Sequence, residues 1–220
     1  MPEPLAAERS DLLRDPFPEV PALGLRERKK ASAMRRLQQI AVEQFEEHGF
    51  ANVTVEHIAE HAEVSPSSVY RYFGTKEGLV LRDEFDDLVF AVAPRLFAAY
   101  DPWTAIVRAL ELLHPLPFVV DDLTRRRMKI WHDTPAVRAA GFLVLDETAT
   151  RLAPMMHEAD RFGRSLKDYQ IVSSSLLGAL FAGLEQWYLE GATRNITDVV
   201  REAVELVRPA WAAEPPERAG

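Results

Sequence analysis

The stretch Thr54–Phe73, TVEHIAEHAEVSPSSVYRYF, predicts two short helices joined by a sharp turn. Thr54 can cap the first helix with its hydroxyl, and apolar residues follow at helical spacing: Val55, Ile58, Ala59 and Ala62. Two turn residues come next. Ser65 can then cap a second helix, and Pro66 suits the first helical position because no partner is needed there for an N–H. So short a connection between two helices is typical of a helix-turn-helix.

The second helix of the pair has a polar side suited to DNA. It carries hydroxyl, phenol and guanidinium groups, from Ser67, Ser68, Tyr70, Arg71 and Tyr72. Short hydroxyls allow close approach to phosphates and base edges, and a tyrosine can donate a hydrogen bond while it covers a sugar or a thymine methyl. Gly74 ends this helix, and Lys76 at the start of the next can reach the DNA backbone. The pattern predicts a recognition helix.

Four segments around the turn resemble the DNA-reading core of TetR-family transcriptional regulators. They are Ser65-Pro66, VYRYF at 69–73, TKEGL at 75–79 and, upstream, FEEHGF at 45–50. The clear resemblance covers about residues 28–87. It implies that Thr54, Ser65, Ser67 and Lys76 contact phosphates, and that Ser68, Tyr70, Arg71 and Tyr72 contact bases or sugars. Family members often carry other residues at the positions of Pro66 and Ser67, so the operator sequence does not follow from the resemblance.

Composition limits the function classes. The chain has 220 residues, 47% hydrophobic and 27% charged, which allows one large domain or two small ones with a buried core. A net charge of -8 argues against a uniformly basic DNA-binding surface but permits a local patch. The absence of cysteine excludes disulfides, thiolate zinc sites and cysteine catalysis. We find no secretion signal or apolar stretch long enough for a membrane span, and expect a cytoplasmic protein without a membrane partner.

Residues 1–24 are rich in proline and acids, and we expect a mobile extension there. A dense basic run follows within eleven positions, opposed only by Glu27: Arg26, Arg28, Lys29, Lys30, Arg35 and Arg36. Beside a helix-turn-helix, this run predicts phosphate contacts, with Arg28 and Lys29 as the candidates. A solvated helix face is the alternative.

The remaining pattern predicts an all-α protein of about nine helices. A first helix from about Arg28 to His48 completes a three-helix helix-turn-helix domain at residues 25–81. A connecting helix beginning at Thr75 carries apolar residues to Val92, until Pro94 kinks or stops it. With the boundary near Arg82, residues 82–213 form a second domain of five or six helices for ligand binding and dimerisation, and residues 214–220 form a tail.

Large apolar residues scattered over the second domain are candidates for a ligand cavity: Phe85, Trp103, Phe118, Met128, Trp131, Phe142 and Met155. The resemblance implies a small-molecule site in this domain, and we expect a largely apolar effector, although ordinary core is the alternative for each residue. Asp121 and Asp122 lie four residues before Arg125 and Arg126, which favours surface salt links over an anion site formed by Arg125, Arg126 and Arg127.

The last two helices, about residues 171–188 and 196–211, are apolar on much of their surface. Small residues on the first would allow another helix to approach closely. We expect both to pair with their copies in a homodimer, through Leu177, Leu180, Phe181, Leu184, Val200 and Val204. Burial within one chain is the alternative. A twofold dimer would place two recognition helices roughly 34 Å apart, as a palindromic operator requires.

An enzymatic reading is a remote alternative. His57, Glu60 and His61 match the H-x-x-E-H pattern of some zinc proteases, which makes a metal-dependent hydrolase the remote alternative. The helix is short, no third ligand is evident, and these residues already fit the first helix of the DNA motif. We therefore expect no enzyme, no metal and no cofactor. The favoured interpretation is a homodimeric repressor released from its operator by a small molecule; the alternatives are an activator or a DNA-binding module that responds to a partner protein.

Overall fold

The computed structural model describes residues 25–82, 86–113, 122–161 and 163–212, and these ranges hold ten α-helices and one short 3-10 helix, with no strand. The predicted all-α class is therefore confirmed. The first part of the chain contains α2 (Leu25–His48), η1 (Phe50–Asn52), α3 (Val55–His61), α4 (Pro66–Phe73) and α5 (Gly78–Leu81). The mobile extension expected at residues 1–24 and the tail expected at 214–220 lie outside the described residues.

The second part of the described chain contains α6 (Asp86–Ala99), α7 (Pro102–Leu113), α8 (Asp122–Asp133), α9 (Pro135–Glu158), α10 (Leu166–Leu189) and α11 (Ile196–Ala212). The helix α10 begins with a capping box, in which Ser165 and Asp168 each satisfy the backbone N–H of the other. Among the described helices, none combines the length and the apolar character that crossing a bilayer requires.

The connection between the two parts differs from the expected single helix. The short α5 ends at Leu81, where Arg82 takes an extended conformation with φ −79° and ψ 149°. The next described helix, α6, begins at Asp86 and continues through Pro94 to Ala99, so the proline does not stop it. Pro94 has no N–H and so removes one hydrogen bond from α6, but the tertiary packing of Val92, Ala93, Leu96 and Phe97 holds the helix together.

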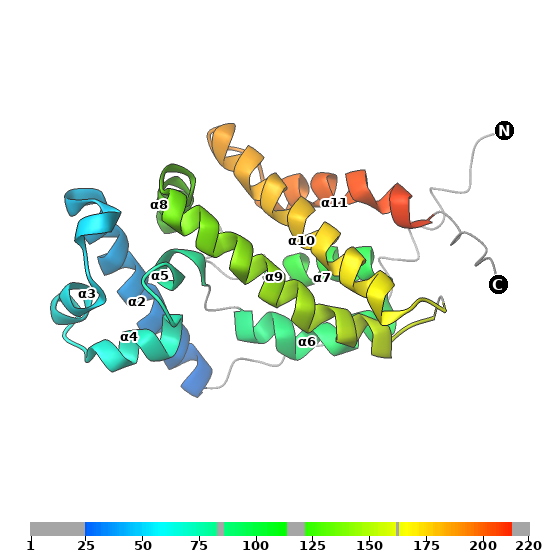
Figure 1. Ribbon diagram of the computed structural model, residues 1–220, viewed down its shortest axis with the longest axis horizontal. Coiled ribbons are helices and arrows are strands. Elements are labelled where there is room, and N and C mark those ends of the chain that lie inside the picture. Colours follow the sequence, from blue (N-terminus) through cyan, green and yellow to red (C-terminus); the bar gives the residue numbers. More distant parts are fainter. Residues whose placement is uncertain (1–24, 83–85, 114–121, 162, 213–220) are drawn as a thin grey trace.

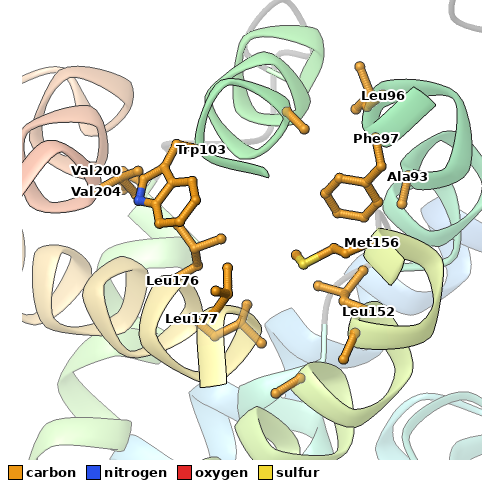
Figure 2. Packing of buried hydrophobic residues seen from close by; sticks show 14 of the residues in the cluster. Ala93, Leu96, Phe97, Trp103, Leu152, Met156, Leu176, Leu177, Val200 and Val204 are labelled. Carbon is orange, nitrogen blue, oxygen red and sulfur yellow. The ribbon is translucent and has the colours of Figure 1, made fainter. Parts of the chain in front are cut away.

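Two hydrophobic cores organise the molecule. One is formed by α6, α7, α9, α10 and α11, and Figure 2 shows part of its packing. The other contains the inward faces of α2, α3, α4 and α5 together with Leu123, Ile130 and Trp131 of α8 and Val137 of α9. A domain of about 50 residues has a marginal core by itself. Here α8 and the start of α9 complete that core, and α8 lies beside the N-terminal helices in Figure 1.

Candidate nucleic-acid interface

Side-chain caps define both helices of the predicted motif. The hydroxyl of Thr54 accepts a hydrogen bond from the backbone N–H of His57 at 3.1 Å and starts α3. The hydroxyl of Ser65 accepts one from the backbone N–H of Ser68 at 3.3 Å and starts α4, with Pro66 at its first position. Both caps were expected from the sequence, because hydroxyl side chains satisfy N–H groups that have no partner within the helix.

The backbone around α4 uses left-handed conformations at both ends. Glu63 takes φ 56° in the turn before it, and Gly74 takes φ 73° directly after it. A few residues further on, a Cβ at Gly78 would lie 2.0 Å from the carbonyl oxygen of Phe73. Only glycine allows the start of α5 to pack so closely against the end of α4. This contact therefore fixes the orientation of α4 relative to α5.

The helix α4 has one buried side and one polar side. Val69 and Phe73 are buried in the N-terminal core, while Ser67, Tyr70 and Arg71 are exposed, Tyr70 by 46%. Ser68 and Tyr72 are half-buried at the edge of the exposed side. The structure thus presents hydroxyl, phenol and guanidinium groups together on one accessible surface.

Three serine hydroxyls gather at the start of α4. Ser65 Oγ lies 2.9 Å from Ser67 Oγ and 3.0 Å from Ser68 Oγ. Further along, the Arg71 guanidinium carbon lies 4.9 Å from the centre of the Tyr72 ring, a cation–π contact that orients the guanidinium on the helix surface. Two sets of predicted DNA-contact residues are therefore already in contact with one another without DNA: the three serines, and the pair Arg71 and Tyr72.

Lys76 has a different environment from the one its place in the sequence suggested. Its ammonium donates hydrogen bonds to the carbonyl oxygens of Phe50 at 2.8 Å and Val53 at 3.0 Å, and it lies 4.3 Å from the centre of the Phe50 ring. Two of its three donors thus hold the link between α2 and α3. Sequence reasoning missed this role because the carbonyl groups lie more than twenty residues away.

The basic N-terminal end of α2 is accessible. Arg28 and Lys29 are exposed there, so their side chains can reach a phosphate. Their neighbour Lys30 instead contacts Asp87 at the start of α6. One turn of α2 thus carries two available cations and one that ties the helix to the second part of the chain.

The two histidines of the H-x-x-E-H pattern have structural partners. His57 Nε2 lies 2.7 Å from Gln44 Oε1, and the Nδ1–H of His61 donates to the carbonyl oxygen of His57 at 2.9 Å. Their rings are 4.3 Å apart, centre to centre. In the described ranges, no group of three histidine, aspartate or glutamate side chains is arranged to hold a metal ion. The contacts therefore give no support to the hydrolase alternative.

The five candidate ligand residues that the structure describes do not converge on one cavity. Trp103 is buried in the second core, which Met155 packs against, while Trp131 belongs to the N-terminal core and Met128 touches both. Phe142 is 63% exposed on the single chain, and its place in a ligand site stays a prediction. Its position on α9 faces away from both cores, which helical periodicity without a known partner face could not reveal. Phe85 and Phe118 lie outside the described residues.

A small pocket lies where the ends of α6, α7, α9 and α10 meet. It is lined by Phe97, Tyr100, Asp101, Pro102, Met156, Ala159, Arg161 and Tyr169 and has a volume of about 50 Å³. The Tyr169 hydroxyl donates to Asp160 at 2.6 Å, and burial, with that bond, raises the pKa of Tyr169 above its ordinary value. Ligand sites usually measure about 300 Å³ or more, so this pocket has room for little beyond ordered water. Its lining residues share no sequence pattern, and only tertiary packing brings them together.

The predicted dimer residues divide into two groups. Leu177, Val200 and Val204 are buried within one chain, exposed by 6%, 1% and 0%, so the same chain already covers them, and their place in a dimer interface stays a prediction. Val200 and Val204 lie beside Trp103 in the second core (Figure 2). Apolar periodicity marks a buried face but does not say which neighbour covers it. Leu180, Phe181 and Leu184 are half-buried, and the Phe181 ring contacts Trp131 with centroids 6.4 Å apart.

The arginines of α8 contact the N-terminal helices rather than forming only local salt links. Arg126 donates from Nε to both carboxylate oxygens of Glu46 on α2, at 3.0 and 3.1 Å, whereas the expected partner Asp122 is 3.9 Å away. The hydrogen bond to Glu46 raises the pKa of Arg126. Arg127 donates to the carbonyl oxygens of Val80 at 2.8 Å and Arg82 at 2.7 Å. Arg125 is exposed, and its expected partner Asp121 lies outside the described residues.

Comparison with known proteins places this geometry in a family. The family model described as bacterial regulatory proteins, tetR family, matches residues 39–82, which include α3, α4 and α5. A second model, described as the MftR C-terminal domain, matches residues 100–212, more than half of the chain.

Individual proteins are similar to this chain. The mycofactocin biosynthesis transcriptional regulator MftR of Mycobacterium tuberculosis is 23% identical over 189 residues, covering 82% of this chain and 91% of the relative. The HTH-type transcriptional regulator TcmR of Streptomyces glaucescens is 27% identical over 206 residues, covering 87% and 89%. The crystal structure of the TetR-family repressor FadR from Thermus thermophilus, in complex with lauroyl-CoA, aligns with a TM-score of 0.49 and 20% identity over 85% of this chain and 99% of that one. The chain belongs to the TetR family of bacterial regulatory proteins and is a DNA-binding transcriptional regulator.

Proposed function

We propose that this protein is a homodimeric repressor that binds a palindromic operator through α4 and is released by a small, largely apolar molecule. The observation that carries the proposal is the polar side of α4. Val69 and Phe73 anchor the helix in the core, and Tyr70 and Arg71 on its opposite side remain exposed. A helix held in this way can enter a major groove without disturbing the core.

The proposed DNA contacts fall into two sets. Ser68, Tyr70, Arg71 and Tyr72 contact base edges and sugars, while Thr54, Ser65, Ser67, Arg28 and Lys29 contact phosphates. The hydroxyls of the second set lie at helix starts, where N–H groups and the helix dipole also favour an anion. Lys76 supports these contacts indirectly, since its ammonium holds the backbone just before Thr54.

A face of α10 supports the homodimer. Its exposed residues recur at helical spacing and are small or apolar along most of the helix: Ile171, Ser174, Ser175, Gly178, Ala182, Gln186 and Leu189. Ile171 is 60% exposed and Leu189 54% exposed. A Cβ added at Gly178 would meet nothing within 4 Å, which leaves room for a second helix to approach. We infer that this face, with the half-buried Leu180 and Leu184, meets its copy across a twofold axis.

The ligand response follows from the tight packing of the second core. The pocket of about 50 Å³ is too small for an effector, so we propose that a ligand enters by separating helices of the second core. Apolar side chains make up that core, so a molecule that enters it should also be largely apolar. The ligand then stabilises a different arrangement of the two DNA-binding domains, and operator affinity falls by the coupling free energy, typically about 1–3 kcal/mol.

Selection from random duplex DNA followed by a fluorescence titration tests the DNA part of the proposal. Wild type should enrich a palindromic site and bind it with an affinity that weakens with salt. Tyr70→Ala should lose the sequence preference but keep its thermal midpoint, because that side chain is on the surface. Lys167→Ala, an exposed cation at the start of α10, is the matched control and should bind as wild type. Failure of the wild type to enrich any sequence would overturn the proposal.

A reporter assay with the selected operator separates repression from activation. Expression from the operator should rise when the gene is deleted if the protein is a repressor. A fall in expression would replace the repressor by the activator alternative while leaving the DNA contacts intact.

A further inference from the structure

The junction between α5 and α6 is held from two directions. The carbonyl oxygen of Arg82, the last residue before the junction, accepts hydrogen bonds from Gln38 Nε2 of α2 and from Arg127 Nη2 of α8, both at 2.7 Å. Gln38 also donates to the carbonyl oxygen of Leu79 at 3.3 Å, and Arg127 to that of Val80 at 2.8 Å. These carbonyl groups belong to the last turn of α5 and have no partner within the helix. Hydrogen-bond donors for the carbonyl groups at the end of α5 therefore come from one helix of each domain, α2 and α8.

The hydrogen bonds from Gln38 and Arg127 to the end of α5 depend on the relative positions of α2, α5 and α8. Gln38 is fully buried, at 0% exposure, and its side chain can satisfy Arg82 only while α2 and the junction keep their distance. Arg127 presents a rigid fork of donors, so its two hydrogen bonds set both the distance and the angle between α8 and α5. A shift of one helix would leave the carbonyl groups of the buried Leu79 and Val80 without these partners.

A second contact from the same helix fixes α2 itself. Arg126, next to Arg127 in the sequence, binds the carboxylate of Glu46 near the C-terminal end of α2. Below these arginines, Leu123, Ile130 and Trp131 of α8 complete the core of the DNA-binding domain. Two consecutive arginines of α8 thus bind two different helices of that domain, Arg126 binding α2 and Arg127 binding α5. Apolar residues of the same helix α8 pack into the core of that domain.

We propose that Arg126 and Arg127 of α8, together with Gln38 of α2, are positioning residues that fix the orientation of the DNA-binding domain on the ligand-binding domain. Met128, the residue after Arg127, packs against both cores, so a displacement of α8 by a ligand in the second core moves these donors directly. This inference rests on the proposed function only in its consequence for the operator; the positioning itself is a property of one chain.

Distance measurements between spin labels test the positioning. The chain has no cysteine, so Ala51→Cys in the exposed η1 and Thr150→Cys on the exposed side of α9 place one label on each domain. Diluting labelled chains with excess unlabelled wild-type chain isolates distances within one chain. Wild type should give a narrow distance distribution. Arg127→Met should broaden it and shift its mean, and Arg126→Met should broaden it less, whereas Arg125→Met, an exposed neighbour, should leave it unchanged.

Hydrogen exchange adds a local readout. Loss of the charged donors at the end of α5 should speed amide exchange at residues 79–82 by about tenfold, since a hydrogen bond to a charged group contributes roughly that factor. If Arg127→Met does not fold, Gln38→Met, of similar size, removes the other donor to Arg82. Wild-type distance distributions for Arg126→Met and for whichever of Arg127→Met and Gln38→Met folds would overturn the inference.

A DNA titration separates this inference from the proposed function. Arg127→Met should weaken binding to the selected palindromic operator but not to non-specific duplex, because only the palindrome requires two correctly oriented domains. Broadened distributions in a protein that selects no DNA sequence would support the positioning role and contradict the proposed repressor.

Discussion

Replacement of Lys76 by methionine separates a structural role from a phosphate contact. In the structure the Lys76 ammonium donates to the carbonyl oxygens of Phe50 and Val53, at 2.8 and 3.0 Å, and lies over the Phe50 ring. Methionine keeps the length and apolar character of the side chain but removes the donors. The backbone between α2 and α3 then loses the group that holds it, while the exposed side of α4 is unchanged.

The expected loss of stability follows from these contacts. A hydrogen bond to a charged group contributes roughly 1.5–3 kcal/mol, and the lower value applies here because water can reach the half-buried site. Two such bonds, with partial replacement by water, and a cation–π contact of roughly 0.5–1 kcal/mol give about 2–3 kcal/mol. For a chain of 220 residues, this loss lowers the thermal midpoint by about 4–12 °C.

Two measurements on Lys76→Met and Lys29→Met distinguish the roles. Calorimetry should show the lowered midpoint for Lys76→Met and a wild-type midpoint for Lys29→Met, whose side chain is exposed. Operator titrations over a range of salt should show the reverse: loss of the Lys29 phosphate contact from both protomers of the dimer reduces the slope of log affinity against log salt by about 1.8, and Lys76→Met keeps the wild-type slope. A wild-type midpoint combined with a reduced slope for Lys76→Met would refute the structural role.

Two further substitutions test the packing of α10. Gly183→Ala should lower the free energy of unfolding by about 1–3 kcal/mol in a denaturant titration, because the new Cβ would lie 3.0 Å from Ala203 Cβ of α11; unchanged stability would mean that the two helices are not so close. Glu185→Gln should lower the thermal midpoint at neutral pH. The hydrogen bond from Arg138 at 2.7 Å holds the pKa of Glu185 below its ordinary value, so this carboxylate stabilises the fold above its unfolded pKa and less as pH falls through the folded one. The difference from wild type should therefore shrink below about pH 4, and a difference independent of pH would contradict the ion pair.

The helix-turn-helix was predictable because its signals are local. Thr54 and Ser65 cap helices with N–H groups only three residues away, and Pro66 fits its position whatever surrounds it. The resemblance at residues 45–79 also rests on such local features. It identified the family correctly, and the family models confirm it.

The ligand and dimer residues were harder to assign because their roles depend on distant neighbours. Val204 and Phe142 both lie on helices with apolar periodicity, yet one is fully buried and the other is 63% exposed. Likewise, the sequence alone does not distinguish Gly178 from Gly183, which both lie on α10. In the structure Gly183 accommodates α11 within the chain, and Gly178 faces open space.

The sequence by itself determined the all-α class, the bounds of α4 and the family, since helix caps, turn residues and periodicity act over a few residues. The tertiary structure decided which apolar faces are covered, and it gave Lys76, Arg126 and Arg127 their partners. Those partners lie more than twenty residues away along the chain. A long cationic side chain can bind a phosphate, a carboxylate or a carbonyl group equally well, and only the packing of the helices brings one of these within hydrogen-bonding distance.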